Sequence, residues 1–147
     1  MKVAIACDHR GFEAKRRLLP VLRQKGHEVE DFGCEGPQSC DYPDFALPAA
    51  RSVAEGRNEV GIMMDGTGIG MSVAANKVPG IRAGLVHDEV TARTSREHNH
   101  CNVLCLGTDL LSEDQIRNIV EIFLTTSWTD GRHAARVKKV MEAEAAK

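Results

Sequence analysis

Apolar stretches of strand length alternate along this chain with longer segments whose apolar residues recur at helical spacing. Four short runs are mostly apolar and one alternates polar with apolar residues, which predicts strands. The strand segments are Lys2–Cys7, Glu28–Phe32, Val60–Met64, Ile81–Val86 and Val103–Leu106. The helix segments are Phe12–Lys25, Asp44–Glu55, Ile69–Lys77, Asp88–Glu97, Ser112–Thr126 and His133–Ala145.

Several helix ends carry local signals. Gly26 follows the first helix, Asp88 is the predicted N-cap of the fourth, and Ser112-Glu-Asp-Gln115 forms a capping box. Strands that are apolar on both faces and alternate with helices predict an α/β protein, a Rossmann-like three-layer αβα sandwich around a five-stranded parallel sheet in flavodoxin-like order. We expect one domain over residues 1–147, with a C-terminal helix that reaches a neighbouring subunit.

Composition narrows the classes of function. The net charge is −2, lysines and arginines form no run, and aromatic residues are few, which argues against a nucleic-acid surface. No apolar run approaches the roughly 20 residues that span a membrane. Met1-Lys-Val-Ala4 begins a strand rather than a signal peptide, so we expect a cytoplasmic protein. The five cysteines form no C-x-x-C pair, and Cys7 and Cys105 lie in apolar runs, which is typical of buried thiols in a reducing compartment.

The most informative segment runs from Val60 to Gly70. An apolar strand leads into Asp65, and the glycine-rich stretch Gly66-Thr67-Gly68-Ile69-Gly70 then opens a helix. Backbone N–H groups of such a loop point into a concave space that favours a phosphate or an oxyanion formed during a reaction. The loop matches neither a Walker motif nor the dinucleotide-binding spacing. Asp65 is therefore a candidate base beside an oxyanion site, and a purely structural tight turn is the alternative.

Polar residues gather where the predicted strands end, which is where open α/β sheets bind ligands. Asp8 and His9 follow the first strand. Segments that each contain an aspartate follow three other strands: Asp65-Gly66, His87-Asp88 and Gly107-Thr108-Asp109. We interpret Asp8 and His9 as candidate site residues. The alternative makes Asp8 a helix N-cap and His9 a solvated loop residue.

Two further groups carry candidate chemistry. His98-Asn99-His100 ends a helix just before the last strand, where a histidine is often only a cation favoured by the helix dipole. Its two histidines lack a third ligand, which makes a poor zinc site. Arg132 and Arg136 lie about one helical turn apart, a spacing that can clamp a phosphate from two sides. A solvated helix start is the alternative for this pair.

Taken together, these motifs resemble the type B ribose-5-phosphate isomerase family, which includes the galactose-6-phosphate isomerase subunits. The resemblance spans nearly the whole chain, and its motifs are Cys7-Asp8-His9-Arg10-Gly11-Phe12, Asp41-Tyr42-Pro43, Gly66-Thr67-Gly68-Ile69-Gly70, Ala74-Ala75-Asn76-Lys77, Gly80-Ile81-Arg82-Ala83, Arg96-Glu97-His98-Asn99, Asn102-Val103-Leu104 and Gly131-Arg132-His133. It implies a cofactor-free and metal-free isomerase that acts on a small-molecule sugar phosphate through an enediol. It also implies a homodimer or homotetramer with active sites between subunits.

The resemblance implies roles for individual residues. His98 would open the sugar ring by proton transfer, and Asp8 would orient the ring oxygen or hydroxyls. The enediolate would be stabilised by Thr67 and by main-chain amides of Gly66, Gly68, Ile69 and Gly70. The remaining contacts would come from His9, Arg132 and Arg136 to the phosphate, Asn99 to sugar hydroxyls, and Tyr42 along the pocket wall.

Two positions depart from the pattern of the family that the chain resembles. The residue before Gly-Thr-Gly is usually a cysteine that acts as the base, and here it is Asp65. We predict that Asp65 takes over this role, as a carboxylate does in triosephosphate isomerase; Cys7 and Cys40 are weaker stand-ins. Asp109 stands where many relatives carry a phosphate-binding arginine, and it would repel a phosphate unless it points away. The sugar can therefore differ from ribose 5-phosphate.

Two other classes of function remain as alternatives. One is a catalytically idle partner subunit of a hetero-oligomeric isomerase, which the two departures would allow. The other is a magnesium-dependent phosphotransfer domain with Asp8, Asp65 and Asp109 at three strand ends. Against the second, no Asp-x-Asp follows the first strand, and the histidines and arginines would have no role.

Overall fold

The computed structural model describes residues 1–146 and contains the predicted strands and helices in the predicted order. The strands are β1 (Lys2–Cys7), β2 (Glu28–Asp31), β3 (Val60–Asp65), β4 (Ala83–Leu85) and β5 (Val103–Gly107). The helices are α1 (Phe12–Gln24), α2 (Pro43–Ala54), α3 (Ile69–Ala75), α4 (Glu89–Glu97), α5 (Glu113–Thr125) and α6 (Ala134–Ala145). The α/β class and the parallel sheet are thereby confirmed.

The strand order is β2-β1-β3-β5-β4, with every pair parallel, so the predicted flavodoxin-like order is wrong. The two strands that exchange places differ in burial. β5 is buried along its whole length, whereas β4 has only three residues, each partly exposed. A short, half-covered strand is suited to a sheet edge, and the longer apolar strand takes the position beside β3.

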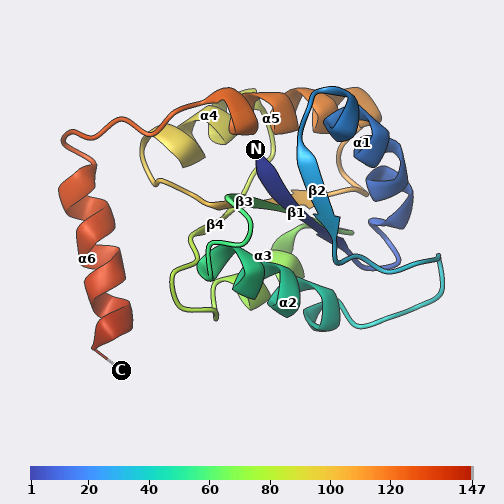
Figure 1. Ribbon diagram of the computed structural model, residues 1–147, viewed down its shortest axis with the longest axis horizontal. Helices are drawn as coiled ribbons and strands as arrows, with labels where there is room; N and C mark the ends of the chain where they lie inside the picture. The colour runs from blue at the N-terminus through green and yellow to red at the C-terminus, as the bar shows by residue number, and fades with distance from the viewer. Residues whose placement is uncertain (147) are drawn as a thin grey trace.

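The helices cover both faces of the sheet (Figure 1). Helices α2 and α3 lie on one face, and α1, α4 and α5 lie on the other. The connection from β4 to β5 returns toward the middle of the sheet. The connection from β1 to β2 crosses the sheet in the same direction as the connection from β4 to β5. Because both crossovers are right-handed, α1 and α4 lie on the same face.

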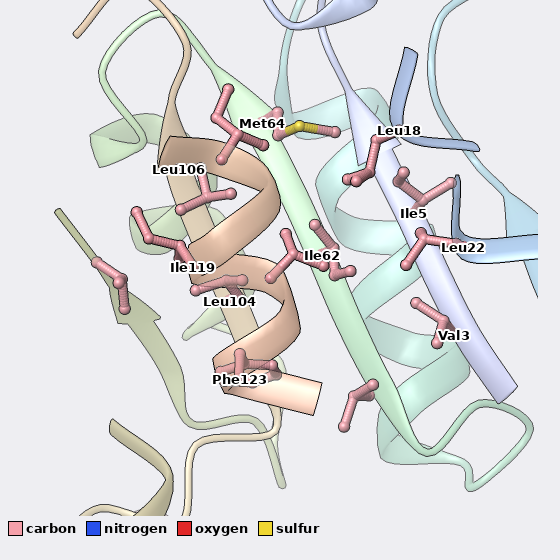
Figure 2. Packing of buried hydrophobic residues seen from close by; sticks show 14 of the residues in the cluster. Val3, Ile5, Leu18, Leu22, Ile62, Met64, Leu104, Leu106, Ile119 and Phe123 are labelled. Atoms are coloured by element: carbon pink, nitrogen blue, oxygen red, sulfur yellow. The ribbon is translucent and has the colours of Figure 1, made fainter. Parts of the chain in front are cut away.

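Residues of the central strands alternate between two apolar cores. On the α1 and α5 face, strand residues pack against Leu22, Ile119 and Phe123 (Figure 2). The other face is built from smaller residues, where Ala4 and Ala6 pack beneath the alanines of α2. These strands are covered on both sides, as a parallel sheet requires, so their carboxyl ends are fixed in position relative to one another.

Local signals read from the sequence are present. Asp88 caps α4 through a capping box with Thr91, and Ser112 caps α5 with Gln115. All five cysteines are free thiols; Cys40 is partly exposed and the other four are buried. None of the helices within residues 1–146 is long and apolar enough to cross a membrane.

Helix α6 stands apart from the two helical layers (Figure 1). None of its residues is buried, and the described contacts that hold it are few. Glu144 accepts a hydrogen bond from the N–H of Gly80 at 2.9 Å, and Met141 Sδ accepts one from Arg82 at 3.4 Å. An amphipathic helix with so little cover in its own chain is open to a neighbour, and its contact with a second subunit stays a prediction.

Candidate active site

Asp65 ends β3, and its carboxylate is directed at the first turn of α3. Oδ1 accepts a hydrogen bond from the N–H of Gly68, and Oδ2 accepts one from the N–H of Met71 at 3.2 Å. Gly68 is the N-cap of α3 and has a φ of 80°, a left-handed conformation that suits glycine. One N–H group expected to face an oxyanion, that of Gly68, therefore already binds the Asp65 carboxylate, so the concave site is smaller than the sequence indicates.

Burial makes Asp65 a stronger base than an ordinary aspartate. The side chain is only 5% exposed, and this burial is the main cause of a raised pKa. The negative charge of Asp8 raises the pKa further, while the hydrogen bonds from Gly68 and Met71 oppose the rise. Desolvation thus outweighs the N-terminus of α3, which is the condition for a carboxylate base at this position.

Tyr42 and Gly70 lie beside the Asp65 carboxylate. A Cβ atom added at Gly70 would lie 2.9 Å from Cζ of Tyr42 and 3.0 Å from Oδ2 of Asp65. A glycine is therefore required where the tyrosine ring crosses α3. Thr67 is exposed next to this place, and its hydroxyl accepts a hydrogen bond from the N–H of Ile69 at 3.3 Å.

Asp8 and His9 are held by backbone groups of neighbouring loops. Asp8 is buried, and its Oδ1 accepts hydrogen bonds from the N–H groups of Arg10 (2.9 Å) and Gly11 (3.2 Å). Gly11, rather than Asp8, is the N-cap of α1, so Asp8 holds the turn before the helix. The N–H of Cys40 donates to Nδ1 of His9 at 3.3 Å. Because Nδ1 acts as an acceptor there, His9 presents an Nε2–H donor to a ligand.

Asp109 does not stand as a free negative charge. Its carboxylate forms an ion pair with the guanidinium group of Arg10, and its N–H donates to the carbonyl oxygen of Gly66 at 3.0 Å. The repulsion of a phosphate that the sequence predicted is therefore reduced by a partner on the loop after β1.

A second set of predicted residues lines a groove of about 640 Å³ between α4, the edge of β4 and α6. His98 is stacked on His133 with ring centroids 4.0 Å apart, and Asn99 and Arg136 line the same groove. Burial, the nearby His98 and the two arginines lower the pKa of His133. Arg132 is exposed next to His133, with 3.5 Å between its Nε and Nε2 of that histidine.

The predicted site residues thus form two separate groups within one chain. We call Asp8, His9, Tyr42 and residues 65–70 the carboxyl-edge group, because they follow the carboxyl ends of β1 and β3 or contact residues that do. We call His98, Asn99, His133 and Arg136 the groove group. His98 and Asn99 precede β5 and so lie near its amino end. This is the end of the strands opposite to the carboxyl ends that carry the first group. No member of the carboxyl-edge group lines the groove.

Comparisons with known proteins identify the family. Residues 3–140 match the family model described as Ribose/Galactose Isomerase. The chain belongs to this family. Ribose-5-phosphate isomerase B of Escherichia coli is 38% identical to it over 143 residues, which cover 97% of this chain and 96% of that protein.

Solved structures agree with this assignment to the isomerase family. Ribose-5-phosphate isomerase B of Clostridium thermocellum is similar with a TM-score of 0.97 at 46% identity, and the match covers 99% of each chain. The same enzyme from Mycoplasma genitalium, solved with bound ribulose-5-phosphate, has a TM-score of 0.95 at 36% identity. That match covers 99% of this chain and 97% of the other.

Sequence reasoning gave no role to two residues of this isomerase-family chain that the structure places beside predicted site residues. His133 stacks on His98, and Arg10 pairs with Asp109. Both occur in motifs that carried the family resemblance, next to Arg132 and His9 respectively. Their position in those motifs was the available signal, but the contacts that they make depend on the fold.

Proposed function

We propose that this chain interconverts an aldose phosphate and a ketose phosphate through an enediol, with Asp65 as the base. The substrate class is ribose 5-phosphate and ribulose 5-phosphate, or a related tetrose, pentose or hexose phosphate. The observation that carries the proposal is a buried carboxylate of raised pKa beside the glycine-rich start of α3, in a chain of this family. The named relatives are ribose-5-phosphate isomerases.

The chemistry assigns one step to each group of residues. His98 opens the sugar ring by proton transfer, and Asp65 then removes the proton from the carbon beside the carbonyl. The oxygen becomes negative as the enediolate forms, and the Thr67 hydroxyl with nearby main-chain amides stabilises it. The hydroxyl proton of the adjacent carbon passes to this oxygen, and protonated Asp65 returns its proton to the former carbonyl carbon, which completes the exchange of aldose and ketose.

Two copies of the chain are needed to build such a site. The carboxyl-edge group holds the base, and the groove group holds His98 and Arg136, yet the two lie toward opposite edges of one sheet. Exposed apolar side chains are available for an interface beside both groups, since Ile69 and Val73 on α3 and Val140 on α6 are each more than half exposed. We propose that the groove group of one copy completes the carboxyl-edge group of another.

The direct test is a panel of sugar phosphates incubated with the wild-type protein in deuterated water. We expect interconversion of at least one aldose–ketose phosphate pair, with deuterium incorporated at the reacting carbon, and no comparable turnover of the unphosphorylated sugar. Ribose 5-phosphate, a tetrose phosphate and a hexose phosphate cover the substrate class. Absence of both turnover and exchange across the panel would contradict the proposal and favour an idle partner subunit.

The magnesium alternative gains no support from the geometry. Within residues 1–146, no group of three histidine, cysteine, aspartate or glutamate side chains is arranged to hold a metal ion. Asp65 accepts hydrogen bonds from backbone N–H groups, and Asp109 pairs with Arg10. The carboxylates of Asp65 and Asp109 are thus engaged by protein donors rather than arranged to bind a metal ion.

A further inference from the structure

An ion pair between two loops borders the carboxyl-edge group. Arg10 follows β1 and Asp109 follows β5, and one guanidinium nitrogen of Arg10, Nη2, contacts Oδ2 of Asp109. Both side chains are partly exposed, at 56% and 39%. Most surface ion pairs of this kind contribute little to stability, so the position of this pair calls for another explanation.

The pair is packed against the glycine loop. A Cβ atom added at Gly66 would lie 2.8 Å from Oδ2 of Asp109 and 3.7 Å from Nε of Arg10. The hydroxyl of Thr108 lies 2.9 Å from the carbonyl oxygen of Arg10 and 3.2 Å from that of Asp65, within hydrogen-bond reach of both. Three loops that follow strands are thus joined at one point, and the guanidinium group is held over the start of the glycine loop.

The chemistry of the guanidinium group indicates what it is held for. Arg10 follows His9, whose Nε2–H is free to donate to a ligand. The contact with Asp109 uses one nitrogen of Arg10, and the remaining N–H groups of its planar fork suit a phosphate. Asp109 fixes the orientation of the fork by holding one end of it.

We propose that Arg10 binds the phosphate of the substrate and that Asp109 is its positioning residue. The loop after β5 thus supplies the carboxylate that orients an arginine from the loop after β1. The carboxylate at position 109 then does not by itself require a sugar other than ribose 5-phosphate. The KM measurements that test this proposal rest on the proposed isomerase function. Calorimetric titration with inorganic phosphate tests it without that function.

The first test is Arg10→Ala, compared with Arg16→Ala. Arg16 is also exposed and forms an ion pair, with Glu13 one turn away on α1, so it is a matched control. We expect Arg10→Ala to raise KM for the sugar phosphate about tenfold or more while kcat changes little, because a charge-assisted contact to the phosphate is lost. Arg16→Ala should leave both constants unchanged. Equal KM values for the two variants would overturn the proposal.

The second test separates positioning by Asp109 from a merely structural ion pair. Asp109→Ala should raise KM several-fold at constant kcat, and Asp109→Asn should restore it, because the amide oxygen still accepts from Arg10. A structural role predicts a lower melting temperature with no change in KM. Equal KM values for Asp109→Ala and the wild-type protein would refute the positioning role.

Calorimetric titration with inorganic phosphate keeps this inference distinct from the proposed isomerase reaction. If no sugar phosphate is turned over, the proposed function fails, yet the wild-type protein should still bind phosphate about tenfold more tightly than Arg10→Ala. Equal affinities, or no phosphate binding by the wild-type protein, would overturn the inference whatever the outcome of the kinetic assays.

Discussion

Replacement of Asp65 by asparagine is expected to lower kcat for the sugar-phosphate isomerisation by about a thousandfold. Removal of a general base typically costs between about 10² and 10⁴ in rate. We expect a loss in the middle of this range, because burial raises the pKa of Asp65 and the first turn of α3 carries no acidic residue that could replace it. Substrate affinity should change only a few-fold, because the proposed phosphate contacts come from other residues.

The matched control for Asp65→Asn is Asp114→Asn. Asp114 is an exposed carboxylate in the first turn of α5, so its replacement makes the same chemical change at a helix start away from the site. Asparagine offers one oxygen where Asp65 accepts two backbone hydrogen bonds, so circular dichroism must show that the variant is folded. Asp65→Cys, which installs the usual residue of the family, should retain more activity than Asp65→Asn. Wild-type turnover in Asp65→Asn would contradict the role of Asp65.

The second large effect is expected from the groove group. The double variant His98→Asn/Arg136→Ala should lower kcat/KM by about a thousandfold, because it removes both a proton-transfer group and a charge-assisted phosphate contact. His98 lies in the groove and Arg136 is exposed on its wall, so neither change opens a cavity in the cores. The melting temperature should therefore stay close to that of the wild-type protein.

A control variant for the groove group is His27→Asn. This histidine lies beside the chain start, where its Nδ1 is 3.3 Å from the amino group of Met1 and outside both groups of site residues. It should leave kcat/KM unchanged.

The single variant His98→Asn should slow the turnover of an open-chain sugar less than that of a cyclic sugar, because ring opening is the step assigned to His98. Unchanged kcat/KM in the double variant would exclude the groove group from the reaction.

The sequence predicted the elements well because their signals are local. Apolar runs, helix spacing, the N-cap at Asp88 and the capping box at Ser112 depend on neighbours in the chain, and all of them recur in the structure. Strand order depends on which strand is better covered by helices from distant parts of the chain, and the two strands differ in burial only in the folded protein. Local patterns therefore did not show that β5, rather than β4, lies beside β3.

The candidate site was less predictable for a related physical reason. The motifs indicated the chemistry of Asp65, His98 and the arginines, but motifs do not show which hydrogen bonds are already made. The Asp65 carboxylate accepts a hydrogen bond from the N–H of Gly68, which the glycine pattern alone suggested was free for a ligand, and a second one from Met71. Pairing across distant loops, such as Arg10 with Asp109, appears only when the chain is folded.

The central claim is that one active site combines the carboxyl-edge group of one copy with the groove group of another. Coexpression of an Asp65→Asn chain with a His98→Asn/Arg136→Ala chain, each carrying a different affinity tag, tests it directly once the mixed assemblies are isolated. Each mixed pair would contain one intact site and one doubly altered site, so activity should recover to about half of the wild-type value. Mixed assemblies as inactive as the two parent variants would contradict the shared site.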